Sequence, residues 1–486
     1  MSSGRRMREE NNKKNVNKLR IAFLIIGLAF LIITIRFYSS ILNTKILPTS
    51  YVAIITIVEI IFTMALVIGL VKKHKTLKLN IFCLFIIIIT SAGYIFANHY
   101  VDVTMNFLGK IFTEVDEVEQ YYIVVRKDST YNKIEDIVGK EVYAFQIEDD
   151  VKEKIQNRVT VTLKAEENLT QLGNDLIDKK IDVVIVSSSQ YNMLSDEIEE
   201  FKDKTKIITT ETHKIETQAS IEDANSKYTI ENRVFSVYIS GIDTYGNINN
   251  VSRSDANIVA TINLNTHEVL LTSIPRDYYV TLHSKKAKDK LTHSGIYGIT
   301  ETVTTVEDFL NIDINYYLRV NFTTLIKLVD TLGGIDVYSD YDFSTVGYHF
   351  KKGYNRLDGN AALAFSRERY SFAGGDNQRI KNQQKVIEAV INKVLNSTTI
   401  LKKYTSILNS LSGSFNTNID QNEVLDIVKK QLESMPSWKI KTISLTGTGS
   451  TNTTYSMGSQ PLYVMIPNES SIQEARNEIK KVMENK

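Results

Sequence analysis

Three long apolar runs near the N-terminus constrain the fold of this chain more than any other feature. They cover residues 21–41, 51–71 and 79–97, and each has about the 20 residues that a helix needs to cross the ~30 Å hydrocarbon core of a bilayer. The runs predict three transmembrane helices, which place the two ends of the chain on opposite sides of a membrane. Glu59 is an ionisable group inside the second run and is therefore a functional candidate. A carboxyl group that is protonated, or bonded to a neighbouring helix, is the simpler interpretation.

Lysine and arginine residues indicate which side of the membrane is cytoplasmic. Residues 1–20 carry seven of them and the loop 72–78, KKHKTLK, carries four lysines, whereas the connection 42–50 has only Lys45. Because basic loops stay inside, residues 1–20 are predicted to be a cytoplasmic tail, residues 21–97 the three transmembrane helices, and the rest extracellular. The single cysteine, Cys83, lies in the third run, and an external part without cysteine is compatible with the outer face of a bacterial membrane. The net charge of +1 says nothing about partners, and no run of like charge marks a nucleic-acid-binding face, so nucleic acid is not expected as a partner.

Residues 98–231 are predicted to form an extracellular accessory domain and a linker. Short β-rich runs such as KEVYAFQ and IDVVIVSSS alternate with charged helical runs, which is typical of a small α/β layer fold. The stretch VRKDSTYNKIEDIVGKEVYAF resembles one lobe of a periplasmic solute-binding protein. A lone lobe has no second wall to close on a ligand, so a spacer or docking module is favoured over a receptor. The polar stretch 213–231 is predicted to be the linker.

After the linker, charged residues stand at the ends of three predicted strands, 234–243, 256–265 and 268–275. If the three strands are antiparallel neighbours, the end of the first, the beginning of the second and the end of the third lie at one edge of the sheet. The charged residues at these ends are then expected to converge: Asp243, Arg253, Asp255, Arg276 and Asp277.

The stretch 363–384, LAFSRERYSFAGGDNQRIKNQQ, adds three more arginines. Arg367 and Arg369 follow a short predicted helix and point the same way in an extended segment. Arg379 and Gln383 fall on the apolar side of a predicted helix over 377–396, in its first two turns.

The position of these groups favours a bound anion, because free N–H groups and the helix dipole already attract negative charge at a helix N-terminus. The alternative is a structural role, in which Glu368 or Asp376 neutralises the charge of a neighbouring arginine. Against it, the five arginines at these element ends outnumber the two carboxylates, Asp243 and Asp255, that would share their site. We therefore predict an oxyanion site.

Several motifs of the chain occur in the order typical of one family. YISGIDTYG, SRSDANIVATIN, LLTSIPRDYYV, DKLTHSGIYG, NYYLRVNFTTLIKLVDTLGGIDV and KKGYNRLDGNAALAFSRERYSFAGGDNQRIKNQQ resemble successive motifs of the LytR-CpsA-Psr family over residues 232–486. Three N-terminal spans followed by an accessory domain resemble its capsule-associated branch. The resemblance implies an α/β domain with a central mixed sheet flanked by helices, in the membrane of a bacterium that is expected to be Gram-positive.

Members of this family attach capsular or other anionic glycopolymers to peptidoglycan, taking the glycan phosphate from a polyprenyl pyrophosphate carrier. The resemblance implies a magnesium-dependent transferase, with a hydrophobic tunnel for the polyprenyl tail and Mg²⁺ or Mn²⁺ as cofactor. The implied partners are the carrier-linked glycan, peptidoglycan, the membrane and capsule assembly proteins. The implied metal ligands are Asp243 and Asp255; the implied pyrophosphate ligands are Arg253, Arg276, Lys290, Arg367, Arg369, Arg379 and Gln383; the implied catalytic set is Asp255, Arg276, Arg367 and Arg369.

The residue types suit phosphoryl chemistry, which asks a protein mainly to position groups and stabilise charge. His293 is a candidate base, although a lone histidine is more often a hydrogen-bonding residue, and Asp255 could instead accept a hydroxyl proton. The chain departs from the family at Thr244, Thr292 and Asn382, which leaves its acceptor preference open. Two other functions stay open: a non-enzymatic regulator that binds the polyprenyl-linked glycan, and a hydrolase of the pyrophosphate.

Overall fold

The computed structural model describes residues 2–44, 49–72, 77–111, 117–215, 233–242, 244–396, 406, 409, 413–420, 423, 427 and 438–484. It divides into two compact units. The first contains Met1–Gly109, and the second contains Lys110–Asp420 and Pro436–Lys486.

The first unit consists of the three apolar helices α1 (Ser2–Thr44), α2 (Thr49–Val71) and α3 (Lys78–Ile111). Among the described residues, three stretches are long and apolar enough to cross a membrane: Asn17–Asn43, Val52–Val71 and Lys78–Asn106. Phe30, Leu70 and Cys83 lie in the contact between the helices. Glu59 accepts hydrogen bonds from Thr63 of its own helix and from the hydroxyl of Tyr94 on α3. The carboxyl group is thus bonded to a neighbouring helix, as the simpler interpretation expected.

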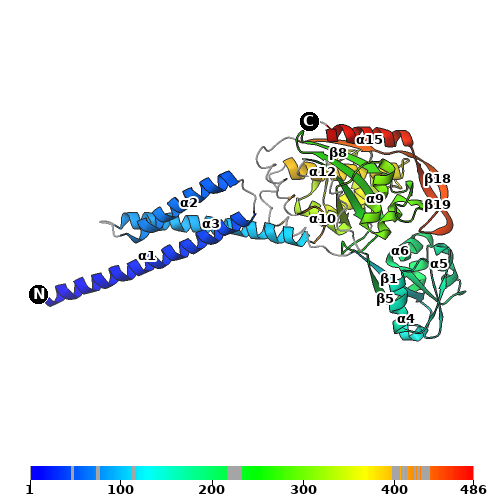
Figure 1. The fold of residues 1–486 in the computed structure, drawn as a ribbon, viewed down its shortest axis with the longest axis horizontal. Helices are drawn as coiled ribbons and strands as arrows, with labels where there is room; N and C mark the ends of the chain where they lie inside the picture. Colours follow the sequence, from blue (N-terminus) through cyan, green and yellow to red (C-terminus); the bar gives the residue numbers. More distant parts are fainter. Residues whose placement is uncertain are drawn as a thin grey trace. The chain divides into compact units, whose positions relative to one another are not determined.

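Residues 117–215 of the second unit form an α/β lobe, which we call the accessory lobe (Figure 1). Its elements are β1 (Glu117–Arg126), η1 (Ile134–Ile137), β2 (Glu141–Ala144), α4 (Asp149–Arg158), β3 (Thr162–Ala165), α5 (Leu169–Ile177), β4 (Val183–Ser187), α6 (Ser188–Glu197), α7 (Phe201–Lys204) and β5 (Thr205–Ile215). The sheet has the order β3-β2-β4-β1-β5. β2 is parallel to both β3 and β4, and β1 is antiparallel to β4 and β5. The last strand runs three residues into the stretch predicted as linker.

Successive side chains along the strands of the accessory lobe point to opposite faces of the sheet, and both faces carry apolar side chains. Ile123 and Ile185 pack with α4 on one face, whereas Val124 and Val184 pack with α5 and α6 on the other. Each face is therefore covered by helix, as expected for parallel strands that read as continuous apolar runs.

Residues 233–484 form the larger part of the second unit, which we call the main lobe. Its elements are β6 (Val234–Ile242), β7 (Ser254–Asn263), β8 (Glu268–Ile274), β9 (Tyr279–Thr281), β10 (Lys288–Lys290), α8 (Leu291–Ser294), η2 (Gly295–Tyr297), α9 (Ile299–Leu310), β11 (Tyr316–Asn321), α10 (Phe322–Thr331), β12 (Ile335–Ser339), β13 (Phe343–Thr345), β14 (Tyr348–Phe350), β15 (Gly353–Leu357), α11 (Gly359–Arg367), α12 (Asp376–Asn396), β16 (Asn416–Thr417), β17 (Lys439–Ser444), β18 (Gly447–Thr454), β19 (Gly458–Pro467) and α15 (Glu469–Glu484).

The central sheet of the main lobe has the order β16-β11-β6-β7-β8-β17. The antiparallel run β6-β7-β8 is the one predicted from the sequence, and β11 and β17 join it as parallel strands on either side. α9 and α15 pack on the sheet through a core that contains Tyr238, Val259 and Ile274. A separate core joins α10, α11 and α12 to the small strand pairs β12–β15 and β13–β14. The mixed α/β fold is confirmed.

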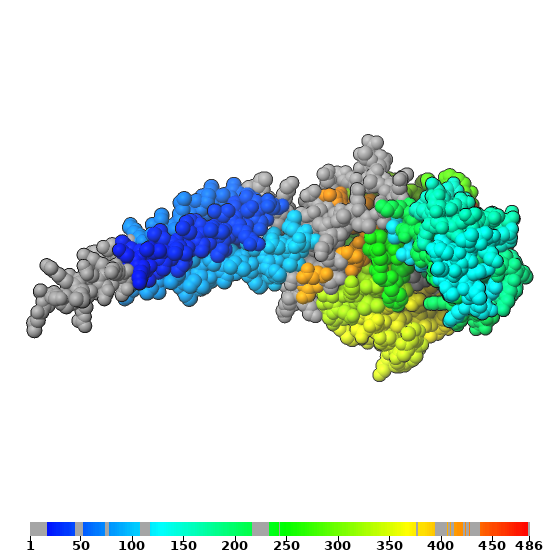
Figure 2. Space-filling model, turned by 90° about the horizontal axis from the view of Figure 1, so that it is seen from below, coloured from blue at the N-terminus to red at the C-terminus, as the bar shows by residue number. Residues whose placement is uncertain are grey.

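The two lobes share a core as well as a surface. Met457 and Leu462, which lie at the turn and in the second strand of the β18–β19 hairpin, are packed within the apolar cluster of α5 and α6. The backbone N–H of Leu169 donates to the carbonyl of Met457, and Val118 exchanges backbone bonds with residues 249 and 251. In Figure 2 the accessory lobe, coloured cyan to teal, abuts the green part of the main lobe without a gap in the atoms. The accessory lobe therefore contacts the main lobe through α5, α6 and the start of β1.

Candidate functional site

The predicted edge of the central sheet exists. Ile242 at the end of β6 pairs with Ser254 at the start of β7, and Asn257 of β7 pairs with Ile274 at the end of β8. Arg253, Asp255 and Arg276 consequently lie next to one another at this edge. Asp243, the other predicted metal ligand, lies outside the described residues.

A cavity of about 1040 Å³ opens at this edge, between the sheet, the helices α10 to α12 and the accessory lobe. It is the place where the residues predicted for an oxyanion site meet. The predicted residues that line it are Arg253, Asp255, Arg276, Lys290, Arg367, Arg369, Arg379 and Gln383.

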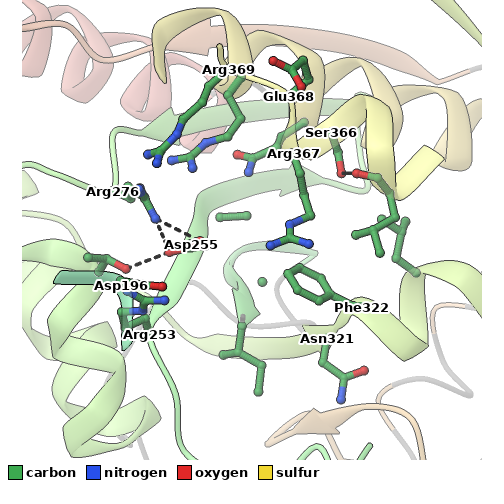
Figure 3. Close-up of a pocket in the computed structure, with 18 of the residues that line it drawn as sticks. Asp196, Arg253, Asp255, Arg276, Asn321, Phe322, Ser366, Arg367, Glu368 and Arg369 are labelled. Carbon is green, nitrogen blue, oxygen red and sulfur yellow. Dashed lines mark hydrogen bonds and ion pairs between the residues drawn. The ribbon is translucent and has the colours of Figure 1, made fainter. Parts of the chain in front are cut away.

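Asp255 is the carboxylate at the centre of the sheet edge (Figure 3). Both of its oxygens accept from Nη1 of Arg276, at 2.9 and 3.0 Å, and Oδ1 also accepts from the hydroxyl of Thr292 at 3.0 Å. Burial alone would raise the pKa of Asp255, but the charges of Arg276, Arg379 and Arg253 outweigh burial and hold its pKa below the usual range. The carboxylate is therefore ionised at any physiological pH.

Two further ion pairs belong to the same wall. Lys290 Nζ lies 3.2 Å from Asp277, whose other oxygen is 3.7 Å from Nε of Arg276. Arg253 donates to Asp196 at 2.6 Å, and Asp196 belongs to α6 of the accessory lobe. Figure 3 shows this pair beside Asp255. The accessory lobe thus touches one of the predicted pyrophosphate ligands directly.

The opposite wall consists of α11, the segment after it and the start of α12. The side chain of Asp358 accepts from the backbone N–H of Ala361, so it caps α11 as predicted, and the helix ends at Arg367. The guanidinium of Arg367 stacks 4.5 Å from the ring centroid of Phe322, and Arg369 donates to the hydroxyl of Tyr370. Figure 3 shows Arg369 pointing from this wall toward Arg276, whereas the guanidinium of Arg367 points toward Phe322.

Arg379 and Gln383 lie in the first two turns of α12 and line the same cavity. The predicted inward direction of both side chains is therefore confirmed. Only 6% of the surface of Arg379 is exposed, so its charge is withdrawn from bulk water and acts strongly on the cavity.

The expected excess of arginines over carboxylates is smaller than the sequence suggested. Among the described residues, six basic side chains line the cavity, and five carboxylates do so: Asp196, Glu197, Asp255, Asp277 and Glu368. The carboxylate of Glu368 accepts from the backbone N–H of Ser371 at 2.7 Å, so it holds the turn of its own segment. The other four belong to the sheet edge or to the accessory lobe. The cavity thus has an ion-paired wall facing a wall that carries Arg367, Arg369 and Arg379.

Sequence reasoning missed Asp196 and Phe322 as parts of the site. Phe322 starts α10 directly after Asn321, whose side chain caps that helix, and the motif NFTTL contains the capping signal. No signal in the sequence marks Asp196, because its position depends on how the two lobes pack.

His293 lines the cavity and is engaged in a buried hydrogen bond. It is 4% exposed, and its Nδ1 lies 2.7 Å from Oδ1 of Asp289, which is itself fully buried. Asp289 also accepts from the backbone N–H of Ser456. The histidine is thereby held between the sheet edge and the β18–β19 hairpin, which agrees with the hydrogen-bonding interpretation.

One side of the cavity is apolar. Beyond Phe322, the lining includes Leu325 of α10, Leu363 of α11, and Val386 and Ile387 of α12. A cavity with a charged end and an apolar end fits an amphiphilic ligand.

The described residues do not by themselves form a metal site. They contain no group of three His, Cys, Asp or Glu side chains that could hold an ion, and the carboxylate at the centre, Asp255, is engaged with Arg276. Carboxylate and hydroxyl oxygens are the donors that Mg²⁺ prefers. The donor chemistry at Asp255 and Thr292 is therefore suitable for Mg²⁺, but the described set is too small for a site.

Residues 191–481 match the sequence model of the LytR_cpsA_psr family. A polyisoprenyl-teichoic acid–peptidoglycan teichoic acid transferase TagU of Enterococcus faecalis is 38% identical to the chain over 218 residues, which are 44% of this chain and 71% of that protein. The protein of the same name from Bacillus cereus is 36% identical over 213 residues, which are 43% of this chain and 69% of that protein. The crystal structure of B. subtilis TagU is 33% identical, with a TM-score of 0.40 over 52% of this chain and 98% of that one.

Proposed function

The chain belongs to the LytR_cpsA_psr family, and from this membership we propose that it transfers a glycopolymer from a polyprenyl pyrophosphate carrier to peptidoglycan. The related transferases from E. faecalis and B. cereus act on teichoic acid by their names. For this chain the proposed cargo is a capsular or other anionic glycopolymer, because three apolar helices and most of the accessory lobe precede the matching region, an arrangement that resembles the capsule-associated branch of the family.

One observation carries the proposal. The cavity of about 1040 Å³ joins a cluster of arginines to an apolar wall, and this combination suits a phosphate group attached to a hydrocarbon chain. Guanidinium groups contact phosphate through two parallel hydrogen bonds, which fixes its orientation as well as its charge. The apolar side chains of α10, α11 and α12 would contact the polyprenyl chain, and the basic end would contact the pyrophosphate.

In the proposed reaction, a sugar hydroxyl of peptidoglycan attacks the phosphorus that carries the glycan. A new O–P bond forms, the bond to the bridging oxygen of the pyrophosphate breaks, and polyprenyl phosphate leaves. The hydroxyl proton passes to a base, for which Asp255 is the candidate at the sheet edge. Arg276, Arg367 and Arg369 stabilise the negative charge on the phosphoryl oxygens as it redistributes. Arg253, Lys290, Arg379 and Gln383 hold the pyrophosphate in place.

Mg²⁺ or Mn²⁺ remains a proposed cofactor. Asp255 and Asp243 would hold the ion, and the ion would supply positive charge to the pyrophosphate oxygens. Arg276, which is paired with Asp255 in the structure, would contact the phosphate from the same sheet edge.

The membrane arrangement is also part of the proposal. The three apolar helices are long enough to anchor the chain. The basic residues at the N-terminus and in the 72–78 loop support a cytoplasmic location for both segments and an external location for the second unit, where peptidoglycan is found.

The decisive experiment incubates the purified full chain with lipid-linked glycan and peptidoglycan fragments, and analyses the products by mass spectrometry. The proposal expects a glycan–phosphate–peptidoglycan adduct and free polyprenyl phosphate, both lost when EDTA removes Mg²⁺. Release of glycan phosphate without an adduct would identify a hydrolase, and binding of the donor without turnover would identify a regulator. Activity that persists in EDTA would remove the metal from the proposal.

A further inference from the structure

A second cavity lies between the two lobes, separate from the arginine site. It has a volume of about 410 Å³, which is within the range of small-molecule sites. Residues of the accessory lobe form one wall, and residues of the main lobe form the other. We call it the interlobe pocket, and its lining is Glu119, Tyr121, Gln146, Ile147, Glu148, Ser187, Gln190, His213, Ile215, Ser284, Lys285, Ile296, Tyr297, Tyr455 and Ser456.

The topology of the accessory lobe explains why a cavity forms at this place. β2 and β4 are parallel neighbours, but α4, which follows β2, packs on one face of the sheet and α6, which follows β4, packs on the other. The two chain segments therefore diverge after the strands end and leave a crevice between them. Ligands of open α/β sheets bind in a crevice of this kind, outside the carboxyl ends of the strands.

The pocket is lined by the residues that follow these two strands. Gln146, Ile147 and Glu148 come after β2, and Ser187 and Gln190 lie at the start of α6. The expectation that this lobe faces no second wall is therefore wrong, because the main lobe closes the crevice.

The closing wall is built from two aromatic residues and their neighbours. The rings of Tyr297 and Tyr455 lie 6.0 Å apart, centroid to centroid, and Lys285 Nζ is 4.8 Å from the ring centroid of Tyr297. Gln146 donates to the carbonyl of Tyr455 at 3.0 Å, and the hydroxyls of Tyr297 and Ser456 are 3.0 Å apart. The bond from Gln146 joins the two walls, and the bond between Tyr297 and Ser456 lies within the main-lobe wall, so the pocket exists before any ligand binds.

The lining does not suit an anion. The start of α6, where an anion would bind, already holds the carboxyl group of Glu119, which accepts from the backbone N–H and the hydroxyl of Ser189 and from the hydroxyl of Ser188. Glu148 adds a second acidic group. The basic members are Lys285 and His213, and His213 is paired with Asp150 at 2.7 Å. No surplus of positive charge among the lining residues is available for a phosphate or a carboxylate.

We propose that the interlobe pocket binds an uncharged sugar unit of a glycan. Tyrosine rings offer flat apolar surface for the C–H face of a sugar ring, while amide, hydroxyl and carboxyl groups offer both donors and acceptors for its hydroxyls. The choice of a sugar over another small polar molecule rests on the proposed function, in which the protein handles two glycans. The pocket would hold one of these glycans by a unit remote from the reacting phosphate.

The test uses the full chain in detergent micelles and saturation-transfer NMR with four uncharged probes: N,N′-diacetylchitobiose, glucose, galactose and rhamnose. At least one probe is expected to bind saturably. Tyr455→Ala should weaken that binding about two- to tenfold, the range that the loss of an aromatic contact produces. Gln146→Ala, at an exposed position, should weaken it less. Tyr354→Ala is the matched control, because Tyr354 is 80% exposed on β15 and does not line the pocket.

Three results would overturn the proposal: no binding of any probe, binding that both pocket variants leave unchanged, or stronger binding of L-lysine or inorganic phosphate than of every sugar. Melting temperatures of the variants show whether each is folded. If Tyr455→Ala does not fold, Gln146→Ala still tests the proposal. Arg367→Ala separates this proposal from the transferase reaction. That variant should lose transfer and keep sugar binding, so a failure of one proposal does not resemble a failure of the other.

Discussion

Arg319 of β11 forms an ion pair with Glu117 at the start of β1, and the two side chains are 0% and 1% exposed. The pair joins the central sheet of the main lobe to the accessory lobe. Glu117 also accepts from the backbone N–H of Ile299 at 2.8 Å, so the carboxylate fastens the start of α9 as well.

Removing either partner should destabilise the second unit strongly. Arg319→Ala and Glu117→Ala are each expected to lower its free energy of unfolding by about 3–5 kcal/mol, because each leaves a buried charge without its partner. Denaturant unfolding followed by tryptophan fluorescence and circular dichroism measures the change. Lys152→Ala is the control, since its pair with Asp149 is 39% and 96% exposed and should contribute about 1 kcal/mol or less. Equal small effects in all three variants would contradict the structural role.

Arginines on the helical wall should matter for transfer. Arg367→Ala, Arg369→Ala and Arg379→Ala are each expected to reduce the rate on the order of a thousandfold, because arginines that stabilise phosphoryl charge contribute that much. Lysine should rescue poorly, since an ammonium group cannot make the bidentate contact. Their combined effects should be less than additive, because all three act on one pyrophosphate.

The control for these variants is Arg356→Ala, at an exposed pair with Asp336 outside the cavity. Its transfer rate should stay within about twofold of the unchanged chain, as surface pairs contribute little. Loss of transfer in proportion to the loss of folded protein would show that the cavity arginines are structural.

Asp196→Ala should strengthen donor binding. Its carboxylate holds Arg253 at 2.6 Å, and a pyrophosphate that binds this arginine must displace it. The side chain of Asp196 is 58% exposed, so the pair contributes about 1 kcal/mol or less and KM for the donor should fall at most about fivefold, with kcat unchanged. Glu199→Ala, in the same segment but not lining the cavity, is the control. A rise in KM would mean that Asp196 positions Arg253 for the donor.

Stability of the accessory lobe should depend on pH through Glu119. Burial is the main cause that raises the pKa of Glu119 to about 7 from an ordinary 4.5, and hydrogen bonds from Ser189 oppose it. The folded state binds more protons than the unfolded state between these values, so the stabilising contribution is complete below about pH 4.5 and is lost as the pH rises through 7. The loss is on the order of 3 kcal/mol.

Unfolding at pH 5 and pH 8 measures this difference. Glu119→Gln should remove most of it, because the amide does not titrate. A difference that survives in this variant would assign the pH dependence to other groups.

Membrane topology can be tested with reporter fusions. A reporter fused after Lys110 should be active only outside the membrane, and one inserted in the 72–78 loop only inside, because the basic residues keep that loop in the cytoplasm. The reverse result would contradict the three-span arrangement.

Structure that depends on residues close together in the sequence could be predicted. The three apolar helices follow from consecutive apolar residues, and the run β6-β7-β8 follows from short connections that leave few alternatives to antiparallel pairing. The same local logic placed Asp255 and Arg276 at one edge of the sheet, and it directed Arg379 and Gln383 inward from α12. These features depend on periodicity and chain length, which the sequence expresses directly.

The partners of those residues were not predictable. Arg253 meets Asp196 across 57 positions, and the carboxylate of Glu117 meets Ile299 across 182. No local pattern specifies either contact.

By itself, then, the sequence determined the three apolar helices, the antiparallel run β6-β7-β8, and the end of the sheet where the charged residues gather. Only the tertiary structure decided that Arg253 is paired with the accessory lobe, that the excess of basic groups in the cavity is small, and that a second cavity lies between the lobes. The physical reason is that hydrophobic periodicity indicates which face of a helix or strand is buried, but it does not indicate which other element that face packs against. The packing of Met457 and Leu462 into the core of the accessory lobe, and the burial of Arg319 with Glu117, set that arrangement through long-range contacts.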